Sequence, residues 1–113
     1  MPRYNVMAIA KSALEGIVRY LAVDLGPQGI RVNALSPGPI KTLAAAGVPG
    51  FRTMLNYADK IAPLRSQITQ DDVGNVAAFL ASDWGKKVTG ETIYIDGGYH
   101  VLGLTVTEDD LKA

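Results

Sequence analysis

Two short stretches of this chain carry the pattern of β-strands, and helical stretches separate them in sequence. Residues 30–36 alternate apolar and polar side chains over their first half, and residues 91–96 form the second stretch. Pro37-Gly38-Pro39 ends the first strand and Gly97-Gly98 ends the second. Strands that are separated by helices pair in parallel through right-handed crossovers. This order therefore predicts an α/β fold with a parallel sheet.

Three helices are predicted around these strands. Apolar residues recur at helical spacing over residues 4–25, which predicts the longest helix. A second, shorter helix is predicted over residues 51–61. The third begins after Thr69, which can cap it, with Asp71 and Asp72 in the first turn. The order of elements is thus helix, strand, irregular segment, two helices and strand.

Two strands are few for a complete domain of this kind, because such sheets usually have more strands with helices on both faces. No G-x-G-x-x-G phosphate loop occurs in the sequence. We therefore expect residues 1–103 to form the carboxyl-terminal part of a doubly wound, Rossmann-like domain whose first half is absent. Residues 104–113 carry little apolar content and are expected to form a flexible tail.

The charge balance argues against several classes of protein. The 113 residues include 11 basic and 11 acidic side chains, so the formal net charge is zero, whereas nucleic-acid binders and polybasic membrane-surface segments need a basic surface. With no cysteine and one histidine, neither a disulfide nor a metal site is expected. Charged residues interrupt the apolar stretch over residues 6–25, and no secretory signal is seen. We expect a cytoplasmic protein.

The chemistry begins at Tyr4 and Lys11. Seven residues are about two turns of a helix, so both side chains project from one face. A phenol, whose ordinary pKa is about 10, becomes a useful acid–base group when a nearby cation favours its charged form. Such pairs also occur by chance in many helices, so the pair alone is compatible with a purely structural helix.

Several sequence blocks give this pair a context. The segment Tyr4-Asn5-Val6-Met7-Ala8-Ile9-Ala10-Lys11 resembles the catalytic helix of the enoyl-acyl-carrier-protein reductases, divergent members of the short-chain dehydrogenase/reductase superfamily. Most of that superfamily places tyrosine and lysine four residues apart, and the enoyl reductases place them seven apart. The resemblance continues, in the family's order, through residues 25–34, 36–44, 62–65, 72–74, 78–80 and 96–98.

The resemblance implies a reaction and a set of roles. In this family a hydride passes from a nicotinamide cofactor to a trans-2-enoyl thioester on acyl carrier protein, a step of fatty acid biosynthesis. By similarity, Tyr4 hydrogen-bonds the thioester oxygen and Lys11 holds the nicotinamide ribose. The cofactor residues implied are Lys11, Pro39, Ile40, Thr42 and Leu43, and the substrate residues are Tyr4, Met7, Ala44, Phe51 and Met54. The implied cofactor is NADH, with NADPH left open, and the implied assembly is a homotetramer.

Two alternatives remain at this point. One is a carbonyl or alcohol dehydrogenase of the same superfamily, if the seven-residue spacing is incidental. The other is a non-catalytic fragment that acts in assembly through the first helix and the last strand.

Four residues outside the implied site have plain structural interpretations. Asn33 is expected to bond backbone near its strand, Asp96 to organise the Gly97-Gly98 turn, Trp84 to pack at a helix end, and His100 to lie at a surface or interface.

Overall fold

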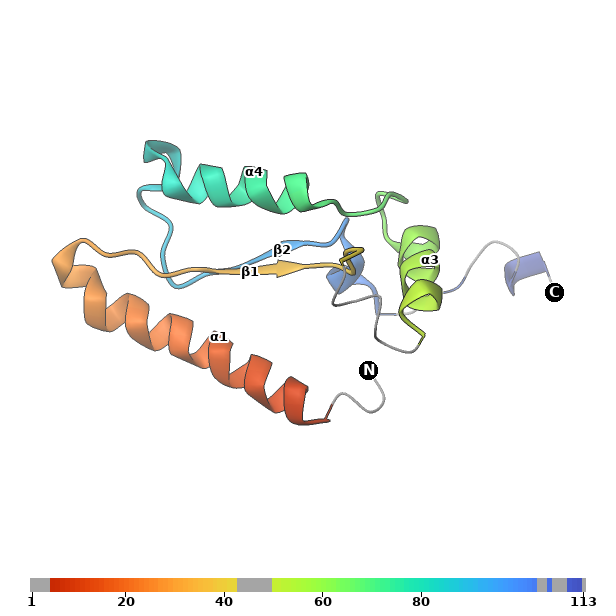
Figure 1. Ribbon diagram of the computed structural model, residues 1–113, viewed down its shortest axis with the longest axis horizontal. Helices are drawn as coiled ribbons and strands as arrows, with labels where there is room; N and C mark the ends of the chain where they lie inside the picture. The colour runs from red at the N-terminus through yellow and green to blue at the C-terminus, as the bar shows by residue number, and fades with distance from the viewer. Residues whose placement is uncertain (1–4, 43–49, 104–105, 107–109, 113) are drawn as a thin grey trace. The chain divides into compact units, whose positions relative to one another are not determined.

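The computed structural model describes residues 5–42, 50–103, 106 and 110–112. The elements follow the order α1 (Asn5–Leu25), η1 (Gly26–Gln28), β1 (Ala34–Pro37), α3 (Phe51–Ile61), α4 (Gln70–Ala81), η2 (Asp83–Gly85), β2 (Thr92–Ile95), η3 (Tyr99–Val101) and η4 (Asp110–Lys112) (Figure 1). The chain divides into two compact units, residues 1–35 with 77–93 and residues 36–76 with 94–113.

Strands β1 and β2 pair with each other in parallel. The Ala34 N–H donates to the Glu91 carbonyl at 2.8 Å, and the Gly38 N–H donates to the Ile95 carbonyl at 2.9 Å. The partners advance together along both strands, as they do only when the strands run in the same direction. The predicted α/β fold with a parallel sheet is therefore confirmed.

The first strand starts later than the sequence pattern indicates. Regular pairing begins at Ala34, so the predicted start at residue 30 was wrong. The Val32 N–H donates to the Thr89 hydroxyl at 3.0 Å, and the Ile30 N–H donates back to the Leu25 carbonyl at 3.3 Å. The Val32 N–H thus bonds a side chain, while the Val32 carbonyl accepts from the Gly90 N–H at 2.7 Å ahead of the regular strand. The apolar–polar alternation of the sequence over residues 30–33 therefore does not correspond to a regular strand.

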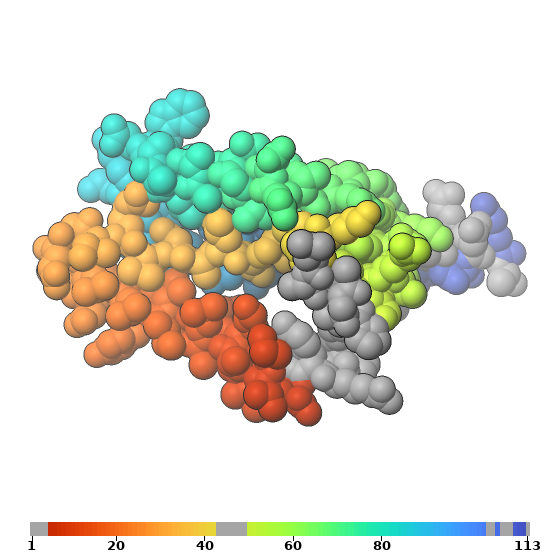
Figure 2. Space-filling view, viewed as in Figure 1, coloured from red at the N-terminus to blue at the C-terminus, as the bar shows by residue number. Residues whose placement is uncertain are grey.

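In the first unit, helix α1 buries only a narrow face. Val18 and Ala22 are buried, and a Cβ built on Gly90 would lie 3.4 Å from the Ala22 Cβ, so this face packs on the segment that leads into β2. Most other large apolar side chains of α1 are exposed, with Ile9 at 73% and Val23 at 78%. Figure 2 shows the helix, coloured red to orange, lying open at the surface.

The end of α4 also belongs to the first unit. It is followed by η2, where Trp84 is 86% exposed. The expectation that Trp84 packs at a helix end was wrong, because the Ser82 hydroxyl caps η2 by accepting from the Trp84 N–H, at 3.2 Å, and leaves the ring outside. Asn33 bonds backbone as expected, donating to Val88 and accepting from Glu91.

The core of the second unit lies at the end of α3. Leu55, Ile61 and Ala62 are buried there, and α3 has the predicted bounds. Helix α4 begins as predicted, with a capping box between Thr69 and Asp72. The Asp72 N–H donates to the Thr69 hydroxyl at 3.2 Å, while the Thr69 N–H and hydroxyl donate to the Asp72 carboxylate at 2.8 and 2.7 Å. Over the described residues, each helix is too short or too polar to cross a membrane.

Candidate functional site

Parallel pairing places the carboxyl ends of β1 and β2 at one edge of the sheet. This edge is where ligands of open α/β sheets bind. Pro39, Ile40 and Thr42 follow β1 at this edge, and each is half-buried. All three were predicted as cofactor-binding residues, and they lie in the second unit.

Gly38 joins this stretch to the turn that follows β2. A Cβ built on Gly38 would lie 3.2 Å from both the Cα and the Cβ of Asp96, and 3.4 Å from Ile68 Cγ1. Contacts this short leave little room for a side chain at position 38. The backbone before Pro39 therefore packs directly against the turn at Asp96.

Asp96 closes that turn with its carboxylate. The carboxylate accepts from the backbone N–H groups of Gly98 and His100, each at 2.9 Å, and from His100 Nδ1 at 3.0 Å. Gly97 and Gly98 adopt φ values of 64° and 86°, a left-handed conformation that glycine adopts at low cost. A Cβ on Gly98 would also lie 2.9 Å from Pro63 Cγ. The expected role of Asp96 in organising this turn is confirmed.

The charge of Asp96 is stabilised by the groups around it. Burial alone would raise the pKa of the Asp96 carboxyl, but hydrogen bonds from the His100 side chain, the His100 backbone and the Gly98 backbone outweigh burial and lower that pKa below its usual value. The His100 ring stacks on Tyr94 with centroids 4.0 Å apart and planes 12° apart. His100 therefore sits between a carboxylate at its Nδ1 and an aromatic ring on its face.

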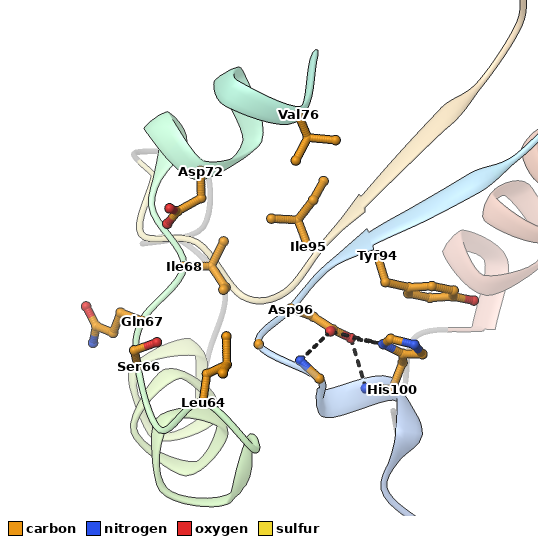
Figure 3. A pocket seen from close by; sticks show the side chains of 12 residues that line it. Leu64, Ser66, Gln67, Ile68, Asp72, Val76, Tyr94, Ile95, Asp96 and His100 are labelled. Carbon is orange, nitrogen blue, oxygen red and sulfur yellow. Dashed lines mark hydrogen bonds and ion pairs between the residues drawn. The ribbon is translucent and has the colours of Figure 1, made fainter. Parts of the chain in front are cut away.

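A cavity of about 490 Å³ lies beside this turn, within the second unit. Figure 3 shows aliphatic side chains from three segments directed toward one another, while the Asp96 carboxylate points to His100. Its lining is formed by Leu64, Ser66, Gln67, Ile68, Asp72, Val76, Tyr94, Ile95, Asp96, Gly97, Gly98 and His100. None of these lining residues belongs to the predicted site.

The other predicted site residues fall on helices α1 and α3. Lys11 and Met7 are exposed on α1 in the first unit, and Tyr4 lies outside the described residues. The geometry of the Tyr4–Lys11 pair therefore stays a prediction. Phe51 and Met54 are half-buried, one turn apart on α3 in the second unit.

Leu43 and Ala44 also lie outside the described residues, as does much of the predicted tail, residues 104–113. The roles assigned to these residues stay predictions. In the part of the chain that the structure describes, there is no group of three or more His, Asp or Glu side chains that could hold a metal ion.

The sequence did not predict two contacts, one within each unit. One is the bond between Asp96 and His100. Their separation by four residues, with Gly97 and Gly98 between them, was a usable signal. The other is made by Arg31, whose guanidinium reaches backbone carbonyls at the end of α4. Nothing local in the sequence indicates that second contact, because the partners lie 49 residues apart.

Residues 1–100 match the family model described as enoyl-(acyl carrier protein) reductase. The enoyl-(acyl-carrier-protein) reductase (NADH) FabI of Aquifex aeolicus is 48% identical over 112 residues, which are 99% of this chain and 42% of that protein. This chain spans about two fifths of the length of the curated relatives it matches.

Solved structures that are similar to this chain are also enoyl-acyl carrier protein reductases. The Bacillus cereus enoyl-acyl carrier protein reductase, solved with NADP+ and indole naphthyridinone, is 55% identical with a TM-score of 0.89, covering 92% of this chain and 40% of that one. The Anaplasma phagocytophilum enoyl-(acyl-carrier-protein) reductase, solved with NAD, is 47% identical with a TM-score of 0.86, covering 96% of this chain and 39% of that one. The described fold is therefore part of a Rossmann-like reductase fold.

Proposed function

Because this chain belongs to the enoyl-(acyl carrier protein) reductase family, we propose that it forms part of an enzyme that reduces trans-2-enoyl thioesters on acyl carrier protein with NADH. The observation that carries the proposal is the family match over residues 1–100, which includes the tyrosine and lysine at a spacing of seven. NADPH is the alternative cofactor, since the Bacillus cereus structure holds NADP+. The product would enter fatty acid biosynthesis.

The residues at the carboxyl edge of the sheet fit a nicotinamide cofactor. The Pro39–Ile40 backbone is held at this edge by the close packing of Gly38 on Asp96, and Ile40 and Thr42 keep part of their surface open. In the proposed site, the Ile40 backbone would meet the carboxamide of the cofactor and the Thr42 hydroxyl its pyrophosphate, and Leu43 stays in the predicted cofactor set. When bound, the cofactor supplies the hydride.

Tyr4 and Lys11 would have different roles in the reaction, one at the substrate and one at the cofactor. Hydride addition to the β-carbon builds negative charge on the thioester oxygen, and a phenol hydrogen bond at that oxygen stabilises the charge as it forms. The ammonium of Lys11 would hold the ribose hydroxyls and keep the local potential positive, which also stabilises the negative charge on the thioester oxygen. Lys11 lies on helix α1, and Tyr4 directly precedes that helix in the sequence.

The acyl chain needs apolar walls. Phe51 and Met54 lie one turn apart on α3 and are half-buried, so they can contact both the core and a ligand. Met7 and Ala44 complete the proposed substrate set. The proposal keeps the expectation of a cytoplasmic homo-oligomer, in which the exposed apolar side chains of α1 would be covered.

The test uses a fusion in which this chain replaces the matching part of the Aquifex aeolicus relative. Oxidation of NADH by the fusion is followed with a crotonyl thioester and, in parallel, with simple ketones. Reduction of the enoyl thioester is expected. Activity on ketones alone would contradict the proposal and favour a carbonyl dehydrogenase of the same superfamily.

Substitutions in the fusion separate the proposed roles. Tyr4→Phe removes the hydrogen bond to the thioester oxygen and should mainly lower kcat. The expected loss of transition-state stabilisation is about 2–4 kcal/mol. Lys11→Ala should also raise the KM for NADH, because it removes the charge that faces the ribose. Lys86→Ala, at an exposed position after η2, is the matched control and should leave both constants unchanged. Unchanged kinetics in Lys11→Ala would remove Lys11 from the site.

A further inference from the structure

The turn after β2 and the loop after β1 are in direct contact through Gly38 and Asp96. The Gly38 N–H donates to the Ile95 carbonyl at 2.9 Å, so Gly38 extends the ladder by one bond beyond β1. A Cβ on Gly38 would lie 3.2 Å from the Asp96 Cα. The position of the Asp96 backbone therefore limits where the Gly38 backbone can lie.

Several hydrogen bonds hold Asp96 in place, through both its side chain and its backbone. Its carboxylate accepts from two backbone N–H groups and from His100 Nδ1, and its carbonyl accepts from the Tyr99 N–H at 3.2 Å. The Asp96 side chain is 9% exposed, whereas His100 is 40% exposed (Figure 3). His100 thus braces the carboxylate from the solvent side, and its ring is itself held by stacking on Tyr94.

The turn is also fixed from the side of the chain that precedes α4. The Leu64 N–H donates to the Gly97 carbonyl at 3.1 Å. Pro63 packs so closely on Gly98 that a Cβ there would lie 2.9 Å from Pro63 Cγ. The turn is therefore anchored on two sides, and Gly38 packs on it.

Two prolines carry this constraint along the chain. Pro37 and Pro39 flank Gly38, and their rings fix φ, so a shift of Gly38 moves the Pro39–Ile40 backbone with it. We propose that Asp96 and His100 are positioning residues that set the backbone at Pro39–Ile40 through Gly38. Because that backbone is the proposed contact of the nicotinamide, this inference rests on the proposed function.

Amide hydrogen exchange in the fusion tests whether Asp96 and His100 hold the Gly38 backbone in place, and it does not depend on enzyme activity. In Asp96→Ala the Gly38 amide should exchange about tenfold faster, because the turn that supports its bond to Ile95 is loosened. His100→Ala should give a smaller increase. His100→Asn should restore slow exchange, since the amide nitrogen of asparagine can take the place of Nδ1 as donor to Asp96. Thr69→Ala, in the same unit, should speed exchange only in the first turn of α4.

Kinetics of the same variants test the link to the cofactor. His100→Ala should raise the KM for NADH about fivefold while the KM for the crotonyl thioester stays unchanged, and His100→Asn should restore it. A change confined to the amount of folded enzyme, with both KM values unchanged, would show a merely structural role and overturn the inference.

The enzyme activity and the positioning role of Asp96 and His100 can be lost separately. An active fusion in which neither Gly38 exchange nor the KM for NADH responds would overturn the inference and leave the proposed function standing. A fusion that does not reduce enoyl thioesters, yet shows faster Gly38 exchange in Asp96→Ala, would overturn the proposed function and support the bracing of the loop.

Discussion

The guanidinium of Arg31 donates a 2.6 Å hydrogen bond to the carbonyl oxygen of Leu80. The same side chain reaches the carbonyls of Gly85 at 3.1 Å and Val88 at 3.4 Å. The last carbonyls of a helix lack partners within the helix. Arg31 therefore satisfies the end of α4 and ties it to the segment that leads into β1.

Arg31→Lys should destabilise the fusion. An ammonium cannot reproduce the planar fork that serves several carbonyls at once, and hydrogen bonds of charged groups contribute about 1.5–3 kcal/mol. We expect a loss of that order in the free energy of unfolding by urea. Arg19→Lys, at an exposed position of α1, is the control and should change it little. Equal stability of the two variants would contradict the role of Arg31.

Gly85 and Gly74 should respond oppositely to the same substitution. A Cβ on Gly85 would lie 2.7 Å from the Phe79 carbonyl oxygen and 2.8 Å from the Leu80 Cα, which are backbone atoms. Gly85→Ala should therefore destabilise the chain by about 1–3 kcal/mol, the usual cost of overpacking.

Gly74 lies inside α4 with nothing within 4 Å of its missing Cβ. Gly74→Ala should stabilise α4 by roughly 0.5–1 kcal/mol, because alanine favours the helix. Thermal unfolding followed by circular dichroism compares the two variants. A rise in Tm for Gly85→Ala, or a fall for Gly74→Ala, would contradict the packing described here.

Asp96 should make the fold sensitive to acid. Its pKa is lowered in the folded state, since the bonds from His100 and Gly98 outweigh the effect of burial. A carboxyl with a lowered folded pKa stabilises the fold above its unfolded pKa, and this stability is lost as the pH falls through the folded value. Urea unfolding of the fusion between roughly pH 5 and pH 2 should therefore show a smaller loss of stability in Asp96→Asn than in the unsubstituted protein.

Asp72 should add to the same acid sensitivity. The side-chain and backbone hydrogen bonds from Thr69 lower its pKa, against a small opposing effect of burial. The variant with both Asp96→Asn and Asp72→Asn should lose more of the acid dependence than either single variant. An acid dependence that is identical in all four proteins would contradict both assignments.

The 113-residue chain on its own should self-associate and bind NADH weakly. Helix α1 exposes Ile9 at 73% and Val23 at 78%, and within the described residues β1 and β2 pair only with each other, which leaves strand edges open. Sedimentation should show oligomers, and Ile9→Lys with Val23→Lys should shift them toward monomer. Two lysines on another helix, Gln70→Lys with Asn75→Lys at exposed positions of α4, should not. A well-folded monomer that binds NADH at micromolar concentration would contradict this prediction.

Local patterns in the sequence predicted the helices. Thr69 and Asp72 lie three residues apart, and a capping box needs nothing from the rest of the chain. The bounds of α3 follow likewise from its own apolar spacing and the Ala62-Pro63 stop. The parallel pairing was predictable because helices separate the strands.

The remaining features depend on partners that are distant in sequence. The strand begins at Ala34 because Val32 bonds the Thr89 side chain, and Arg31 reaches Leu80 across 49 residues. At the site, the resemblance named Pro39, Ile40 and Thr42, whereas the support that Asp96 gives to Gly38 is visible only in three dimensions.

The exposure of Trp84 has an optical consequence. It is the one tryptophan of the chain, and 86% of its surface is open to water. Its emission in the folded chain should already resemble that of an indole in water, so unfolding will barely change the fluorescence. A polypeptide that covers η2 will shift the emission to the blue. The chain thus carries its own unlabelled reporter of association at this surface, one that is nearly silent toward folding.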